Sequence, residues 1–115
     1  IVKNSFSSSL DNLMRETRTS NEYLADLLGF EDPKTIQRYR NAAASKRNPD
    51  RNFVISICFA LRLSLRCASS LLETCGYTFF RDNQADQLCI TLIVRHIGYE
   101  NAKAILHVCG YSNLL

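Results

Sequence analysis

Apolar residues along this chain recur mainly at intervals of three and four positions, which is the spacing of one face of an α-helix. In the first such segment they are Phe6, Leu10, Leu13 and Met14, and serines at 5–9 offer oxygens for an N-cap. Continued along the chain, the pattern predicts an all-α fold of seven helices and no strands. Their expected ranges are about 7–17, 21–28, 33–43, 50–61, 64–75, 82–97 and 100–109.

The residues at the predicted helix ends agree with these ranges. Ser20 precedes the second helix and Gly29 follows it, as an N-cap and a C-terminal glycine would. Asp32 can cap the third helix, and Pro33 suits its first position. Ser64 is expected to cap the fifth helix, and Asp82 to open the sixth. The chain has only 4 glycines and 2 prolines in 115 residues, which favours helices joined by short loops over a turn-rich β-sandwich.

Two of the predicted helices end in the same three residues, Cys-Gly-Tyr, at 75–77 and 109–111. These residues belong to a degenerate repeat in which 63–77 aligns with 97–111. We expect each glycine to adopt a left-handed conformation just beyond its helix, and the tyrosine after it to pack back onto that helix. The repeat therefore predicts a shared way of ending a helix.

Positive charge is concentrated in one segment of the chain. Between Lys34 and Arg51 there are six lysines and arginines against one acidic residue, Asp50, whereas the net charge of the whole chain is only +3. This cluster covers the third predicted helix and the loop after it, and neutralising nucleic-acid phosphates requires such a cluster. A solvated basic helix face gives the same pattern, and the neighbouring Glu31 and Asp32 count against DNA binding.

The sequence gives no sign of a membrane span, a metal, a cofactor or a catalytic site. Its longest runs without Asp, Glu, Lys or Arg, 52–61 and 104–115, are far shorter than the roughly 20 residues of a membrane-spanning helix, and no signal peptide is recognisable. Five cysteines without a Cys-x-x-Cys pair argue against a disulfide framework or a zinc site and favour a reduced, cytoplasmic setting. Since His96 and His107 have no partner at catalytic spacing, we expect a non-enzyme.

Four segments, and the apolar positions that follow in register from Pro49 to Leu65, resemble those of one known family in order along residues 10–65. The four segments are Leu10-x-x-Leu13-Met14, Thr-Ser-Asn-Glu-Tyr-Leu-Ala-Asp-Leu-Leu-Gly-Phe at 19–30, Thr-Ile-Gln-Arg-Tyr at 35–39 and Lys-Arg-Asn-Pro at 46–49. They resemble the first helix, the second-helix motif, the recognition helix and the Lys-Arg-x-Pro of the lambda-repressor-like helix-turn-helix family, also called the xenobiotic-response-element type. The resemblance implies a five-helix DNA-binding domain at 1–77, with a C-terminal helical hairpin at 78–115 packed on it as one compact unit.

The chain departs from the family pattern in two loops. The stretch 30–36 is one residue longer than usual, so the turn before the third helix must be enlarged. Residues are also added after Tyr39, around 42–45, and Arg40 stands where Glu is common in the family. Because alanine is the best helix former, we expect the third helix to extend into this insertion. The same departures also suit a domain that keeps the fold and has lost DNA binding.

The resemblance implies a docking mode in which the third helix, 33–43, enters the major groove and the second crosses the DNA backbone. Lys34, at the start of the third helix, is then expected to face the bases. Gln37 and Arg38 follow on nearby faces, and glutamine can pair with adenine and arginine with guanine.

The remaining contacts implied by the resemblance are with the sugar-phosphate backbone. Lys46 and Arg47 are expected to meet phosphates, whereas Asn21 and Asn41 match positions that contact the backbone in the family, with local capping as their alternative role. The full set of expected DNA-binding residues is Asn21, Lys34, Thr35, Gln37, Arg38, Asn41, Lys46 and Arg47.

Two hypotheses for the function follow. The first is a DNA-binding transcription regulator that acts as a homodimer, with helices at 82–109 for dimerisation or sensing, because the apolar run 88–94 exceeds one amphipathic stripe. The second is a helical protein-interaction module that keeps the repressor fold without binding DNA. The enlarged loops and the start at Ile1 rather than Met favour the second, which would then be part of a larger protein. Two further alternatives are that the chain binds RNA or that it accompanies a catalytic domain outside this sequence.

Overall fold

The computed structural model describes residues 5–41 and 48–115, and over these residues it contains seven α-helices and no strand. The helices are α1 (Phe6–Glu16), α2 (Asn21–Leu28), α3 (Lys34–Arg40), α4 (Arg51–Ala60), α5 (Leu65–Glu73), α6 (Gln84–Val94) and α7 (Tyr99–Val108). The all-α fold and the seven helices predicted from the sequence are confirmed. Five helices lie close to their predicted ranges, whereas α3 and α6 end earlier than expected.

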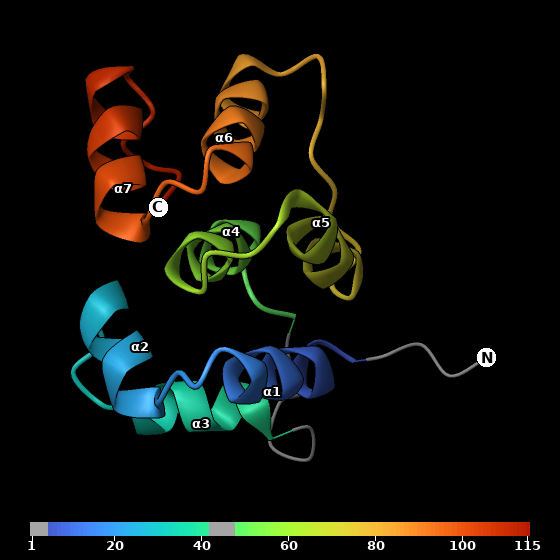
Figure 1. Ribbon diagram of the computed structural model, residues 1–115, viewed down its shortest axis with the longest axis vertical. Coiled ribbons are helices and arrows are strands. Elements are labelled where there is room, and N and C mark those ends of the chain that lie inside the picture. Colours follow the sequence, from blue (N-terminus) through green and yellow to red (C-terminus); the bar gives the residue numbers. More distant parts are fainter. Residues whose placement is uncertain (1–4, 42–47) are drawn as a thin grey trace.

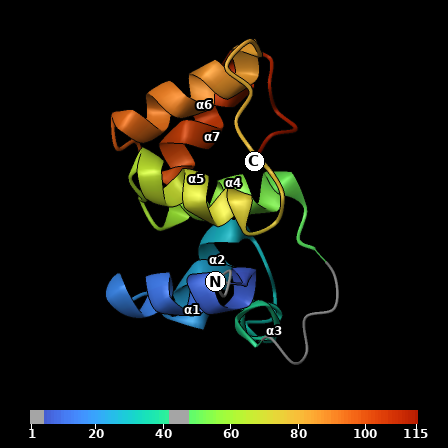
Figure 2. The ribbon, with the colours of Figure 1, turned by 90° about the vertical axis from the view of Figure 1, so that its right-hand side faces the viewer.

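The helices are stacked in three tiers (Figure 1, Figure 2). The first tier holds α1, α2 and α3, the middle one α4 and α5, and the last one α6 and α7. The central helix is α4, which contacts α2, α5 and α7 and whose residues 54–59 are all buried. A helix that is apolar on nearly every side is expected to be buried on all of these sides, as α4 is. The radius of gyration, 13.5 Å, is that of a compact domain, for which about 13 Å is expected at 100 residues.

A chain of aromatic rings connects α3 to the core. The Tyr39 ring lies 4.6 Å from the Phe53 ring of α4 and 6.2 Å from the Phe6 ring of α1, measured between centroids. Phe53 also meets Phe30, in the turn before α3, at 5.8 Å and edge to face. Aromatic pairs at such distances add to the stability gained from burial alone. The proposed recognition helix is therefore anchored to both α1 and α4.

Polar side chains cap four of the helices at their N-termini. Each accepts a hydrogen bond from the backbone N–H three residues later, and the caps are Ser5, Ser20, Ser64 and Asn83. The caps expected at Ser20 and Ser64 are confirmed. The expectation that Asp82 opens the sixth helix is wrong, because Asn83 Oδ1 accepts the Asp86 N–H at 3.0 Å and the helix begins at Gln84.

Six helices end in the same way, with one residue of positive φ followed by a residue whose N–H reaches back into the last turn. The positive-φ residues are Arg18, Gly29, Arg62, Gly76, His96 and Gly110. At the Cys-Gly-Tyr sequences, Tyr77 N–H donates to Leu72 O at 3.0 Å and Tyr111 N–H to Leu106 O at 2.8 Å. This is the helix-ending motif expected from the repeat.

The same motif explains why α6 is shorter than predicted. His96 takes the left-handed conformation, with φ of 57°, and the Ile97 N–H donates to Leu92 O at 3.1 Å. The apolar pattern does continue to Ile97, but this residue packs on the core from beyond the helix. The motif places its hydrophobic contact after the helix end.

The third helix is also shorter than the sequence suggests, and the expected continuation of this helix past Arg40 is wrong. It ends at Arg40, and Asn41 is extended, with φ of −102° and ψ of 104°. Helix propensity is a small local preference, so the tertiary contacts that hold Tyr39 and Arg40 outweigh it. The insertion around 42–45 lies outside the described residues.

Candidate nucleic-acid interface

The start of α3 is fixed by the acidic residue before it. Asp32 Oδ1 accepts the Lys34 N–H at 2.9 Å, so this carboxylate satisfies a backbone donor of the first turn, as expected of Asp32. The helix begins at Lys34, one residue later than predicted, although Pro33 already has helical dihedral angles. Asp32 therefore has a structural role that accounts for an acidic residue at this position.

The outward face of α3 carries three of the residues expected to contact DNA. Lys34, Gln37 and Arg38 are all exposed, whereas Ile36 is fully buried. With about 100° of rotation per residue, positions i, i+3 and i+4 share one face of a helix, and Ile36 lies on the opposite one. Thr35 is half-buried at the edge of this face. The structure thus brings together the residues that sequence analysis assigned to the bases.

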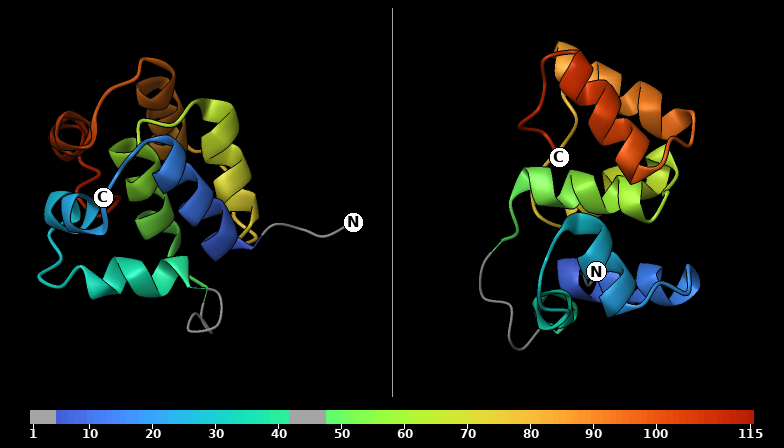
Figure 3. Two further views of the ribbon diagram at one scale, coloured as in Figure 1. Left: turned by 60° about the horizontal axis from the view of Figure 1, so that its bottom comes forward. Right: turned by 90° about the vertical axis from the view of Figure 1, so that its left-hand side faces the viewer.

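The helices α2 and α3 cross steeply, with a five-residue connection at 29–33 between them. In the left view of Figure 3, α2 is seen nearly along its axis while α3 lies across the page. A helix-turn-helix usually has a turn of about three or four residues, often with a glycine, and here Gly29 is the left-handed residue that ends α2. The enlarged turn inferred from the sequence is therefore present.

A hydrogen-bond network runs beneath the exposed face, from α1 through α2 to α3. Asn21 Nδ2 donates to Gln37 Oε1 at 2.7 Å, and Asn21 Oδ1 accepts from Arg40 Nη1 at 2.8 Å. Arg40 also binds Asp11 Oδ1, through Nε at 2.9 Å and Nη2 at 2.8 Å. The other oxygen of Asp11 pairs with Arg15 at 3.0 Å. Asn21 therefore contacts Gln37 directly, and this contact is neither of the roles expected for it from the sequence.

Two of the basic residues counted in the cluster are neutralised by partners elsewhere in the fold. Arg40 has only 16% of its side chain exposed and pairs with Asp11. Arg51 pairs at 2.6 Å with Asp86, whose side chain is 4% exposed. Neither guanidinium is available for a phosphate, so the interpretation of the whole 34–51 cluster as one footprint is wrong for these two residues. Among the described residues of the segment, Lys34 and Arg38 are the exposed cations.

The last three expected contacts lie after α3. Asn41 is exposed, and its N–H donates to Arg38 O at 3.2 Å, so it follows directly on the outward face. Lys46 and Arg47 lie outside the described residues. Beyond them, Asn48 Nδ2 donates to Cys75 O at 3.0 Å, which fixes the return of the chain to the core.

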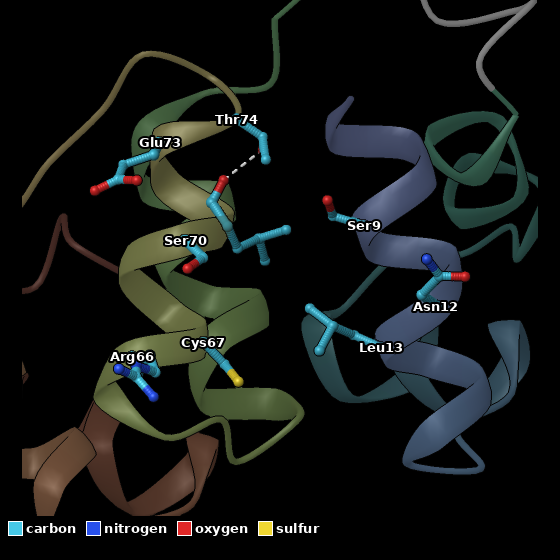
Figure 4. A pocket seen from close by; sticks show the side chains of 9 residues that line it. Ser9, Asn12, Leu13, Arg66, Cys67, Ser70, Glu73 and Thr74 are labelled. Atoms are coloured by element: carbon cyan, nitrogen blue, oxygen red, sulfur yellow. Dashed lines mark hydrogen bonds between the residues drawn. The ribbon is translucent and has the colours of Figure 1, made fainter. Parts of the chain in front are cut away.

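A second surface feature is separate from this face. A groove of about 560 Å³ lies between α1 and α5, lined by Ser9, Asn12, Leu13, Arg66, Cys67, Ser70, Leu71, Glu73 and Thr74. Figure 4 shows side chains from both helices turned toward it, with Leu13 projecting from α1 toward α5. None of its lining residues belongs to α2 or α3. No pattern in the sequence predicts this groove, because it depends on how two distant helices pack.

The five cysteines divide into buried and exposed thiols. Burial raises the pKa of Cys58 to about 12 and that of Cys89 to about 11, and it also raises the pKa of Cys75. Cys67 and Cys109 are exposed. In the part of the chain that the structure describes, no disulfide forms and no three His, Cys, Asp or Glu side chains gather as a metal site would require.

Comparison with known proteins gives no match. No protein-family model, no curated protein and no solved structure matches the chain. The resemblance to lambda-repressor-like domains therefore rests on the sequence segments within 10–65. None of the helices within 5–41 and 48–115 is long and apolar enough to cross a membrane.

Proposed function

We propose that this chain binds double-stranded DNA, with α3 in the major groove and α2 across the backbone. The observation that carries the proposal is the outward face of α3, where Lys34, Gln37 and Arg38 project together while Ile36 and Tyr39 hold the helix to the core. These three side chains are of the types that read base edges in the major groove. Regulation of transcription is the role that such binding would serve.

The proposal needs little positive charge from the described residues. Lys34 and Arg38 supply two exposed cations, and Lys46 and Arg47 are expected to add phosphate contacts from the following loop. Each neutralised phosphate makes binding more salt-dependent, so a face with few cations predicts modest affinity for random DNA and a shallow salt dependence. Base contacts must then supply much of the affinity at a preferred site.

Selection from random-sequence duplex DNA tests the proposal. The full chain is incubated with the duplex pool at low salt, and the bound DNA is sequenced over several rounds. We expect a short motif to be enriched. A matched pool selected with Gln37→Ala should lose that enrichment at one position, since a good base contact is worth about 1–3 kcal/mol. Recovery of no motif, with no measurable binding to any duplex, would reject the proposal.

A homodimer formed through α6 and α7 is part of the proposed function, since two half-sites are usually read by a dimer. In the apolar run 88–94, Leu92 and Ile93 are buried in the chain's own core, whereas Val94 is 56% exposed, and Val108 on α7 is 84% exposed. Light scattering across a concentration series should show twice 13.1 kDa at high concentration, and Val108→Lys should shift the equilibrium toward monomer. A mass of 13.1 kDa at every concentration would exclude the dimer.

A second candidate function, a protein-interaction module, is favoured by Tyr23. This side chain is 60% exposed on α2, on the helix face away from Asn21. Hollows of about 340 and 520 Å³ lie beside it, and Arg62 lines both. Exposed tyrosine and arginine are enriched at protein interfaces. If the chain binds DNA, Tyr23→Ala should leave that binding unchanged. If the wild type binds no DNA but binds a protein partner that Tyr23→Ala no longer binds, the second function is favoured.

A further inference from the structure

The hydrogen-bond network beneath α3 has a fixed direction, because one of its members is only a donor. An arginine guanidinium carries N–H groups and no acceptor, so the atom of Asn21 that faces Arg40 must be the oxygen. Arg40 Nη1 indeed donates to Asn21 Oδ1 at 2.8 Å. The amide nitrogen of Asn21 is thereby directed toward Gln37, where it donates to Oε1 at 2.7 Å.

The orientation of Asn21 in turn sets that of Gln37. Because Oε1 of Gln37 accepts from Asn21, the amide nitrogen of Gln37 is left facing outward, and within residues 5–41 and 48–115 it has no hydrogen-bond partner. Oε1 retains one free lone pair. The exposed end of this side chain therefore offers chiefly a donor.

We propose that Arg40 is a positioning residue that determines which amide atom Gln37 presents to DNA. The inference rests on the proposed function. Arg40 contacts no base, since its side chain is 16% exposed and is held by Asp11, and it acts through Asn21. In the major groove, adenine and guanine present the N7 acceptor and thymine presents O4, whereas cytosine presents only its N4 donor. The base opposite Gln37 is accordingly one that offers an acceptor, and cytosine is the least favoured.

Arginine is suited to this task by its three nitrogens. Nε and Nη2 both bind Asp11, which fixes the plane of the guanidinium and leaves Nη1 directed at Asn21. A lysine has one nitrogen and no planar fork, so it keeps the charge beside Asp11 without fixing this geometry. Arg40→Lys is therefore the variant that preserves the ion pair and releases Asn21.

Exchanging the two ends of the ion pair reverses the direction of the network. The charge-swap variant combines Asp11→Arg with Arg40→Glu. In this variant the carboxylate at position 40 accepts from Asn21 Nδ2, and Asn21 Oδ1 then faces Gln37. The Gln37 amide nitrogen becomes the donor to Asn21 and Oε1 points outward. Arg15→Ala is included, because Arg15 also pairs with Asp11 at 3.0 Å and would repel an arginine there. Arg15→Ala alone is the matched control.

The first measurement is made on the free protein by NMR, as the solvent exchange of the Gln37 side-chain amide protons. We expect the Gln37 amide protons to exchange rapidly with solvent in the wild type and in Arg15→Ala. In the charge-swap variant, at least one of these protons should be protected. Arg40→Lys should speed exchange of the Asn21 amide protons. If the charge-swap variant is folded and its Gln37 amide protons exchange with solvent as fast as in the wild type, the proposal is overturned, whether or not the chain binds DNA.

The second measurement is selection from random duplexes with the same proteins. The wild type and Arg15→Ala should prefer adenine, guanine or thymine over cytosine at one position by about tenfold or more, from the energy of a good base contact. The charge-swap variant should lose or invert that base preference, and Arg40→Lys should weaken it. If Gln37 exchange responds but no duplex is selected, the proposed function fails while the orienting network stands. If a motif is selected and the charge-swap variant selects the same motif, Arg40 does not determine specificity.

Discussion

The side chains of Arg51 and Asp86 meet at 2.6 Å although 35 residues separate them in the sequence. Arg51 also donates to the Thr78 carbonyl at 2.9 and 3.3 Å, and Asp86 accepts the Phe80 N–H at 2.6 Å. The pair therefore ties α4 to α6 and fixes the connection between α5 and α6. A second polar contact joins α4 to the segment after α7, because Asn52 Nδ2 donates to Asn113 O at 2.9 Å.

Removal of the Asp86 carboxylate is expected to destabilise the fold strongly. The Asp86→Ala variant leaves the Arg51 guanidinium, 22% exposed, without its ion-pair partner, and breaking such a pair costs about 3–5 kcal/mol when both charges are buried. Since Arg51 keeps some access to water, we expect about 3 kcal/mol at the lower end of this range. Urea unfolding measures it, with Asp82→Ala as the exposed control. Equal stability of the two variants would mean that the pair contributes nothing.

The helix ends make a second prediction about stability. Gly76 has φ of 77° and nothing within 4 Å of an added Cβ, so Gly76→Ala is opposed by backbone strain alone and should cost about 1 kcal/mol. His96 adopts φ of 57° at the equivalent position of α6, so His96→Gly should be neutral or stabilising by up to about 1 kcal/mol. Urea unfolding should therefore show a loss of stability for Gly76→Ala and no loss for His96→Gly. A destabilising His96→Gly would show that its side chain has a role that the structure does not explain.

Thiol reactivity should separate the five cysteines into two groups. The pKa values of Cys58, Cys75 and Cys89 are raised by burial, so these thiols are both protonated and inaccessible at pH 8. Cys67 and Cys109 are exposed. A chromogenic disulfide reagent should therefore titrate two thiols rapidly and the other three only at the rate of unfolding. Rapid reaction of a third thiol would contradict the packing around α4 and α6.

The helices could be predicted from the sequence because their signals are local. Apolar spacing, serine caps and the glycines at helix ends act within a few residues, and the structure confirms the caps at Ser20 and Ser64 and the left-handed Gly76 and Gly110. The exception at the end of α3 has an origin that is not local. Helix propensity favoured continuing α3 past Arg40, but contacts with distant elements determined where it ends.

The candidate site was predicted less completely, because charge counting ignores partners. Arg40 and Arg51 count as phosphate ligands in the sequence, yet their carboxylates lie 29 and 35 residues away, at Asp11 and Asp86. No spacing rule connects such pairs. The exposed face of α3 was found correctly, since the burial of Ile36 determines the direction of its neighbours along a helix of known pitch.

Binding of four single variants to a preferred and a random duplex tests the central claim that α3 reads bases. Lys34→Ala and Gln37→Ala should weaken binding to the preferred duplex by about 1–3 kcal/mol and change binding to random DNA far less. Lys46→Ala and Arg47→Ala should weaken both duplexes alike and reduce the salt slope by about one unit each, as phosphate contacts do. Arg95→Ala, an exposed cation at the end of α6, should change neither. The account is contradicted if all four variants act equally on both duplexes, or if none changes binding while the fold stays intact.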